Sequence, residues 1–281
     1  MTVQSFKPTL WEGALIANFH NTSVAFNGRL SAEPTEITAE KIKFNAIGKG
    51  NVKDYTAGSI SWEELDTTDV DLTFDQQKYF AFKVNDVDKV QMKRELLMDA
   101  TSEHAAIMGE LYDNNFYKTL ADGADTKNNV GSTGTKKKAH KLNAYDLIVD
   151  LSTALSKAKA PKVNRFVTVN AEFLGLLAKD PRFTPNPKVL ANGIVEGQVI
   201  AGMEVVACEE LPANKIIAHW KKAIGTGMQI DEVEALRLQS DFADGVRGLQ
   251  KYGAKVLKKE GIAVLHYEIV DTPTVTVEET V

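Results

Sequence analysis

The stretch DFADGVRGLQKYGAKVLKKEGIAVL, from Asp241 to Leu265, decides how the C-terminal part of the chain folds. Its tetrapeptide Gly-Val-Arg-Gly, Gly245–Gly248, first suggests a loop that grips a phosphate. From Tyr252 to Val256, however, larger apolar side chains occupy every second position, which is typical of a strand. A turn at Lys258–Gly261 leads into another apolar run, so the pattern predicts a β-hairpin. We therefore interpret the glycines as turns and points of close packing.

Composition and charge exclude several classes of protein. The 281 residues suffice for one large domain or two small ones with a sizeable core. A formal net charge of -5 argues against a protein that coats nucleic acid electrostatically. Cys208 is the single cysteine, which excludes an internal disulfide framework and a cysteine-based zinc site. Neither a membrane span nor a secretory signal is recognisable, so we expect a soluble chain suited to a reducing compartment.

Residues 42–84 contain alternating apolar runs separated by a long polar segment. Ile42 and Phe44 share one face, and the runs 70–74 and 80–84 alternate in the same way. This pattern predicts a long two-stranded hairpin with an extended tip. Because a lone hairpin is marginal in water, we expect this one to rest on a neighbouring subunit or domain. We expect Trp62, near the tip, to contact a neighbouring subunit.

A long helix is predicted over residues 86–121. Asn85 or Asp86 can cap it, and the segment contains no proline. One apolar stripe is predicted on this helix, made of Val90, Leu97, Ala100, His104, Ile107, Met108 and Leu111. At about 1.5 Å per residue the helix would be roughly 54 Å long, which is long for a small globular core. We interpret it as a structural spine.

A polar loop follows the helix, and then an α/β region begins. The Lys136–Lys138 run in the loop is interpreted as solvated or, alternatively, as contacting an anion or a subunit. Asn143 with Asp146 resembles an N-terminal helix cap, and Pro161 ends the helix. The apolar stripe of this helix is Leu147, Ile148, Leu151 and Leu155. A strand at 163–170, a short helix at 171–183 and strands within 197–212 and 215–220 are predicted after it.

The residues show no recognisable catalytic pattern. The histidines are His20, His104, His140, His219 and His266, and none lies in a known motif. His104 falls on the apolar stripe, where a core or interface role is the more common one. There is no nucleophile elbow, no His-Glu-x-x-His motif and no Walker-type phosphate loop. We therefore assign no catalytic, cofactor-binding or metal-binding residue and expect no enzyme.

The remaining candidate motifs have ordinary structural interpretations. The Gly-Thr-Gly at Gly225–Gly227 lacks the third glycine of a dinucleotide site and is interpreted as a turn. The acid pairs Glu63–Glu64, Glu209–Glu210 and Asp231–Glu232 have no histidine at metal-ligand spacing. The G-x-x-G pattern also occurs in an RNA-binding fold, but that fold needs flanking helices and a basic face.

Several stretches together resemble one known family. The C-terminal half contains Glu-Ala-Leu at Glu234–Leu236, Asp-Gly-Val-Arg-Gly-Leu at Asp244–Leu249, and Tyr-Gly-Ala-Lys-Val at Tyr252–Val256. With VIAGMEVVACEELP before them and FKPTLWEGALIANF near the start, these resemble tailed-bacteriophage major capsid proteins of the Hong Kong 97-type fold. The resemblance covers essentially the whole chain in order. It implies an α+β fold.

The resemblance also implies a division of the chain. It comprises an N-terminal arm at 1–37, an E-loop hairpin at 38–84, a P-domain with the spine helix at 85–141 and 236–281, and an A-domain at 142–235. Such subunits assemble through pentamers and hexamers into an icosahedral shell around double-stranded DNA, without sequence-specific DNA binding. A scaffolding protein and a portal are implied as partners, together with a decoration protein in some relatives. The implied location is the virion, and the host cytoplasm during assembly.

Two features of the family are not carried over to this chain. Some relatives begin with a helical scaffolding region, but here the arm begins close to Met1, so a separate scaffold is expected. Others crosslink subunits through a lysine and an asparagine, and no motif here places such a pair. Two alternatives remain open: an encapsulin-type nanocompartment, which shares the fold, and a small α/β enzyme without a recognisable motif.

Overall fold

The quoted stretch divides between two sheets. β11 (Ala243–Val256) is the middle strand of a three-stranded sheet with the order β10-β11-β4, and β12 (Ile262–Ile269) belongs to a six-stranded sheet with the order β5-β12-β9-β6-β8-β7. The short 3-10 helix η3 (Lys259–Gly261) connects them. The predicted hairpin between these two strands is therefore wrong, because alternation identifies strands but does not say which strands pair.

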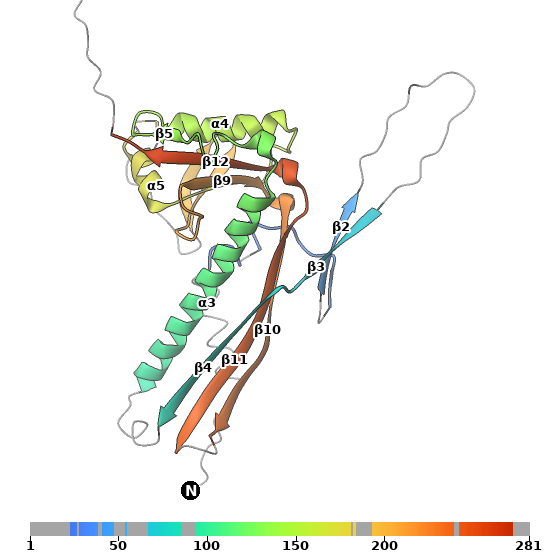
Figure 1. The fold of residues 1–281 in the computed structure, drawn as a ribbon, viewed down its shortest axis with the longest axis vertical. Coiled ribbons are helices and arrows are strands. Elements are labelled where there is room, and N and C mark those ends of the chain that lie inside the picture. Colours follow the sequence, from blue (N-terminus) through green and yellow to red (C-terminus); the bar gives the residue numbers. More distant parts are fainter. Residues whose placement is uncertain are drawn as a thin grey trace, which may run out of the picture.

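A computed structural model describes residues 23–26, 28–38, 41–47, 54, 67–85, 94–180, 182–183, 193–238 and 242–271. Figure 1 shows a broad part built on the six-stranded sheet and a long part that extends away from it. We call the six-stranded sheet with helices α4 (Ala144–Lys157) and α5 (Ala171–Ala178) the body. The three-stranded sheet with helix α3 (Arg94–Gly123) is the limb.

The body sheet is covered on both faces. Its other strands are β5 (Lys137–Ala139), β6 (Arg165–Val169), β7 (Ile194–Ile200), β8 (Met203–Ala207) and β9 (Lys215–Trp220). Val167 of β6 packs in the cluster beneath α4 and α5, whereas the adjacent Phe166 packs in a second cluster with Phe116 of α3. Because both faces of the sheet are covered, every residue of β6 is buried. Its sequence therefore does not alternate between apolar and exposed polar residues.

The first body helix follows the prediction closely. Leu147, Ile148, Leu151 and Leu155 are all buried, which confirms the predicted stripe of α4. Asn143 stands at the cap position, but its side chain accepts a hydrogen bond from the His140 amide at 2.8 Å and donates one to the Lys138 carbonyl at 2.8 Å. The residue therefore fixes the preceding loop rather than the first turn of the helix. The connecting 3-10 helices are η1 (Thr126–Asn128) and η2 (Lys221–Ala223).

The limb combines one long helix with one long sheet. α3 runs for 30 residues from Arg94 to Gly123, which confirms a long helix over the described part of the predicted range 86–121. Residues 86–93, with the predicted cap Asp86, lie outside the described residues, and Asn85 is the last residue of β4. Beside it, β10 (Ile224–Arg237), β11 and β4 (Gln76–Asn85) pair antiparallel, with a register shift between Ile230 and Glu232. Within the described residues, no helix is both long and apolar enough to cross a bilayer. In Figure 1 the helix and the sheet run side by side away from the body.

The predicted stripe of the long helix is partly wrong. Met108 is buried, but Ile107 is 46% exposed and Leu111 is 40% exposed. The buried side is formed instead by Tyr112, Phe116, Tyr117 and Leu120, together with Met108. A seven-residue repeat fits a helix with one partner, whereas α3 contacts the limb sheet through β11 and the body sheet through β9 and β12. Val90 and the side chain of Leu97 lie outside the described residues.

A separate hairpin packs on the base of the limb. β2 (Lys41–Ile47) pairs antiparallel with β3 (Thr67–Thr73), which confirms the predicted hairpin, and β1 (Glu36–Ile37) extends it. Ile42, Phe44 and Leu72 form a small core with Ala32. Residues 76–84 do not continue the hairpin as predicted, because β4 pairs with β11 of the limb. The tip with Trp62 lies outside the described residues.

Each of the two sheets combines strands that lie far apart in the chain. β5 and β12, both outside 142–235, pair into the body sheet, with β12 beside β9. β10 begins at Ile224, before residue 235, and pairs into the limb sheet. The chain therefore crosses between body and limb at Ile224 and again at η3, where the sequence predicted a turn at Lys258–Gly261.

Candidate functional site

Most of the described histidines have structural surroundings. His219 is buried between Phe116 and Phe166, and its Nε2 lies 2.9 Å from the Leu30 carbonyl. Burial lowers the pKa of His219 to about 4, so its ring is neutral at neutral pH. His104 packs against Phe80 and Phe82 with ring centroids 5.9 Å and 5.1 Å apart, which agrees with the predicted core or interface role.

The other polar candidates do not assemble into a reactive centre. His140 Nδ1 accepts from the Leu142 amide at 3.3 Å in the loop before α4, and His20 lies outside the described residues. Cys208 is buried, and burial raises the pKa of its thiol to about 12, so the nucleophilic thiolate is disfavoured. Within the part of the chain that the structure describes, no three acidic, histidine or cysteine side chains could together hold a metal ion.

The Gly-Val-Arg-Gly tetrapeptide is part of a strand. Arg247 lies opposite Glu234 of β10 and donates from Nε to its Oε2 at 2.7 Å. The charge that could have held a phosphate is therefore paired with a carboxylate on the next strand. A Cβ added to Gly248 would stand 2.3 Å from Cε1 of Phe80, so this glycine marks close packing, as interpreted, but no turn. Gly225–Gly227, predicted as a turn, likewise lies within β10.

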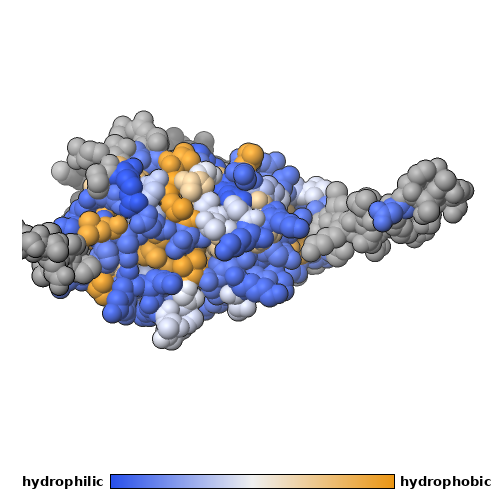
Figure 2. All heavy atoms as spheres, turned by 90° about the horizontal axis from the view of Figure 1, so that it is seen from above, coloured by the Kyte–Doolittle hydropathy of each residue, from blue (hydrophilic) through white to orange (hydrophobic). Residues whose placement is uncertain are grey.

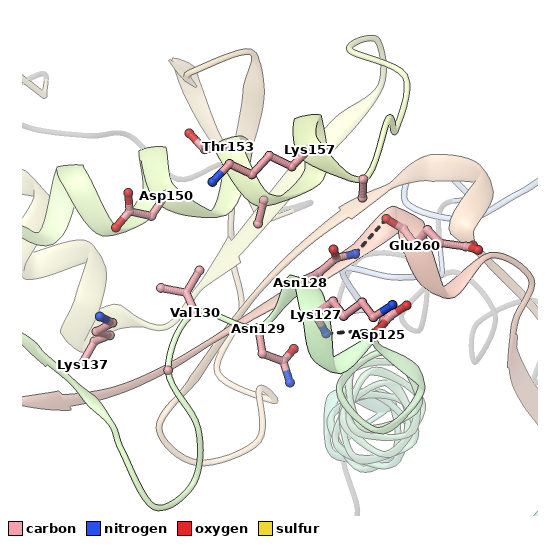
Figure 3. Close-up of a pocket in the computed structure, with 13 residues that line it drawn as sticks. Asp125, Lys127, Asn128, Asn129, Val130, Lys137, Asp150, Thr153, Lys157 and Glu260 are labelled. Atoms are coloured by element: carbon pink, nitrogen blue, oxygen red, sulfur yellow. Dashed lines mark hydrogen bonds between the residues drawn. The ribbon is translucent and has the colours of Figure 1, made fainter.

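A polar depression lies where the end of α3 meets α4. It measures about 710 Å³ and is lined by residues of η1, β5, α4 and η3. Figure 3 shows its lining side chains, including Lys137 from the predicted lysine run and Lys157 and Asp150 from α4. Asn128 donates from its Nδ2 to the carbonyls of Glu260 at 3.0 Å and Ile262 at 3.1 Å, which ties η1 to η3.

This depression has mixed charge. Lysines and carboxylates alternate around it, so it concentrates neither sign. Part of the predicted lysine loop forms the edge strand β5, which pairs parallel with β12, and Lys136, Lys137 and Lys138 are all exposed. Whether these lysines contact an anion or a subunit stays a prediction. The depression could contact a polar surface of another molecule, but the arrangement of its side chains does not resemble that of an enzyme site.

The exposed apolar side chains point to contact with other molecules. Tyr79 on β4 is 82% exposed and Phe242, just before β11, is 87% exposed. Tyr79 lies opposite Leu249 on the limb sheet, on the face turned away from α3. Figure 2 shows the end of the molecule that carries α4, where hydrophobic residues gather in a band within a mostly hydrophilic surface. Large apolar side chains left in water mark surfaces that a partner covers.

A family model described as phage capsid protein matches residues 69–265. That range spans the limb sheet, the long helix and nearly all of the body. The chain belongs to the phage capsid protein family. This membership confirms the resemblance drawn from the Glu234–Leu236, Asp244–Leu249 and Tyr252–Val256 segments, all of which lie inside the matched range.

Solved structures from phages and of a virus-like particle are similar in fold to this capsid protein. A chain from Mycobacterium phage Che8 is 26% identical over 94% of both chains, with a TM-score of 0.60. The capsid of Ralstonia phage GP4 has a TM-score of 0.64 at 9% identity and covers 88% of this chain and 92% of its own. A virus-like particle from Pyrococcus furiosus has a TM-score of 0.58 at 14% identity, covering 94% of this chain and 100% of its own. No curated protein matches the chain.

The sequence analysis missed Asp113. This aspartate lies on α3, is 3% exposed, and accepts hydrogen bonds from three consecutive residues near the N-terminus. The sequence does contain a signal for it. Asp113 stands between Tyr112 and the apolar pair Phe116–Tyr117, so a charged residue occurs among the apolar residues of the predicted helix. An acid on the apolar side of a helix needs local partners when it is buried.

Proposed function

We propose that the chain is the major capsid protein of a tailed phage, which assembles through pentamers and hexamers into an icosahedral shell enclosing double-stranded DNA. The observation that carries the proposal is the family match over residues 69–265. The Che8 chain supports it, since the likeness extends over 94% of both chains. The role is structural rather than enzymatic, in keeping with the mixed charge of the polar depression and the high pKa of the Cys208 thiol.

In this proposal the limb and its hairpin are the regions that reach other subunits. The β2–β3 hairpin corresponds to the E-loop, α3 and the limb sheet to the P-domain, and the body to the A-domain. The N-terminal arm precedes the hairpin. Exposed large apolar side chains occur both on the limb and on the body, which supports contacts between copies over both regions. They are Tyr79, Phe242, Ile107 and Leu111 on the limb and Leu142, Val163, Val199 and Ile269 on the body.

The net charge of -5 is compatible with a container for DNA. A shell surface of the same sign as its cargo does not bind DNA tightly, so packaged DNA stays mobile. A scaffolding protein, a portal and a decoration protein are the further proposed partners. The proposed location is the virion, and the host cytoplasm during assembly.

Electron microscopy of the purified full chain tests assembly directly. We expect rings and closed shells with five-fold and six-fold clusters, either from the chain alone or after co-expression with the proposed scaffolding protein. A stable monomer or dimer that forms no rings under both conditions contradicts the proposal. Size-exclusion chromatography of the same samples quantifies the assembled fraction.

The likeness to the virus-like particle from Pyrococcus furiosus keeps a second container function in view. A protein nanocompartment would share the fold and the shell but would hold protein. Nuclease-protected nucleic acid in particles purified from infected cells separates the two functions. We expect protected double-stranded DNA of genome length, whereas a co-purifying enzyme without DNA would favour the compartment.

A further inference from the structure

Residues 23–26 and 28–33 form a strap that contacts both the limb and the body. The strap lies just before the hairpin and follows residues 1–22, which are outside the described residues. Its first part is bound to α3 through Asp113, and its last part reaches β10, where the Ala32 amide donates to the Ile224 carbonyl at 2.8 Å. The strap is thus the root of the proposed arm.

Three donors of the strap form hydrogen bonds with the Asp113 carboxylate. The Ser23 hydroxyl donates to Oδ1 at 2.5 Å, the Val24 amide donates to Oδ2 at 2.8 Å, and the Ala25 amide donates to Oδ1 at 3.1 Å. Both carboxylate oxygens and three consecutive residues therefore take part. Hydrogen bonds to an ionised acceptor are the stronger kind, and three from one segment fix its direction as well as its position.

Asp113 would be an unfavourable residue here without the strap. It is 3% exposed, and burying a carboxylate costs free energy unless hydrogen bonds replace water. The pKa of the Asp113 carboxyl is raised overall, because burial, with a smaller contribution from the Glu210 charge, outweighs the donors Ser23, Val24 and Ala25, which lower it. The same hydrogen bonds therefore stabilise the buried carboxylate and fix the strap on α3.

Further contacts hold the strap against the body. The Leu30 carbonyl accepts a hydrogen bond from Nε2 of the buried His219 at 2.9 Å, and Arg29 forms an ion pair with Glu204 of β8. A Cβ on Gly193 would stand 2.7 Å from Cγ1 of Val24, which shows how closely the strap passes the start of β7. The strap is therefore held along its length, and the preceding chain joins it at Ser23, next to Asp113.

We propose that Asp113 is a positioning residue for shell assembly: it fixes the strap on α3 and thereby sets the point on each subunit from which the chain before Ser23 begins its reach toward a second copy. The reach toward a second copy rests on the proposed function. The fixation of the strap does not, because it follows from hydrogen bonds within one chain. The two parts can therefore be tested separately.

Tryptic cleavage tests the fixation. Lys7 precedes Pro8, a bond that trypsin leaves intact, so the first cleavable bond of the chain is Arg29–Leu30 within the strap. In Asp113→Asn one acceptor oxygen becomes an amide that faces a donor. We expect release of the 1–29 peptide from unassembled subunits to accelerate by at least about tenfold, as the loss of a charged hydrogen-bond partner predicts. Asp122→Asn, an exposed acid on the same helix, should leave the rate unchanged. Equal rates in wild type and Asp113→Asn overturn the proposal.

Assembly tests the positioning. We expect Asp113→Asn to reduce the yield of shells by about tenfold or more. Because Val24, Ala25 and Leu30 of the strap belong to the core cluster, the thermal midpoint of unassembled subunits should fall as well. Leu155→Ala, which damages the core beneath α4 away from the strap, is the matched control, and both variants are assembled at the same interval below their midpoints. Equal yields of shells in the two variants would mean that Asp113 is merely structural and that the proposal is wrong. If wild type forms no shells at all, the proposed function fails, and the cleavage assay still decides whether Asp113 fixes the strap.

Ser23 provides a second test of the same contact, and the single variant Ser23→Ala serves alone should Asp113→Asn not fold. Ser23→Ala removes one donor and leaves the two amides, so cleavage after Arg29 should accelerate by a smaller factor. In the Asp113→Asn background the same change should add nothing, because the partner oxygen pair is already altered. Additive effects of the two substitutions, or an unchanged rate in Ser23→Ala, would show that Asp113 does not act through Ser23.

Discussion

The body and the limb differ in how completely one chain covers its own sheets. The body sheet lies between α4 and α5 on one face and the end of α3 on the other, and both faces are apolar. The limb sheet has α3 on one face, while its other face carries the hairpin at its base and, farther along, the exposed Tyr79 and the Arg247–Glu234 pair. The elements of the body thus cover both faces of its sheet, whereas one face of the limb sheet is largely open, although both regions also expose large apolar side chains, such as Val199 on β7 and Tyr79 on β4.

The strongest way to break this comparison is to damage the core of the body. Phe173 of α5 is fully buried, and its ring meets Tyr267 of β12 at a centroid distance of 5.2 Å. Phe173→Ala should lower the free energy of unfolding by about 3–5 kcal/mol, because it removes a large apolar side chain and leaves a cavity. Urea unfolding of unassembled subunits measures this loss. A loss below about 1 kcal/mol would mean that the body core is not the main source of stability.

The next largest effect concerns pH and the junction between body and limb. Burial lowers the pKa of His219 to about 4, whereas an unfolded histidine titrates near 6.5. Between these values the unfolded chain binds a proton that the folded chain does not, so stability falls as the pH falls from 6.5 to 4. This residue alone should contribute a slope of about 1.4 kcal/mol per pH unit.

His219→Gln isolates that contribution. The substitution should flatten the dependence of unfolding free energy on pH between 6.5 and 4, even if the variant is less stable at pH 7. Burial and the neighbouring Lys215 and Lys136 also lower the pKa of His266, so His266→Gln should reduce the slope in the same direction. An unchanged slope in His219→Gln would show that the ring is not kept neutral by its surroundings.

The sequence predicted elements better than their pairing. α4 and strands β6, β8 and β9 were predictable because their apolar residues are close in sequence and their ends carry proline or turn residues. The partners of β4 and β12 were not, since a strand pattern is equally compatible with any neighbour. The contact of Asp113 with Ser23 joins residues 90 positions apart, and a helix pattern contains no information about such a partner.

A smaller effect separates the glycines of the two regions. In the limb, a Cβ on Gly253 would stand 2.8 Å from the carbonyl oxygen of Thr73, where the hairpin crosses β11. Gly253→Ala should therefore cost about 1–3 kcal/mol, because backbone must move. In the body, a Cβ on Gly175 of α5 would meet nothing within 4 Å. Gly175→Ala should stabilise the subunit by up to about 1 kcal/mol, since alanine favours a helix. Thermal unfolding of both variants checks the opposite signs, and equal signs would contradict this account of the hairpin contact.

The smallest expected effect lies in the tetrapeptide that first suggested a phosphate site. Arg247 and Glu234 pair across β11 and β10, with side chains 64% and 36% exposed. An ion pair so open to water contributes at most about 1 kcal/mol, and salt screens it. Arg247→Ala and Glu234→Ala should each change the unfolding free energy of unassembled subunits by less than that, and the double variant should show little coupling in 0.5 M salt. A large loss of stability in either single variant would mean that the outer face of the limb is more protected than its exposure indicates. A large loss of assembled shells with unchanged subunit stability would instead place this pair in a contact between copies, which is the behaviour that the difference between body and limb predicts.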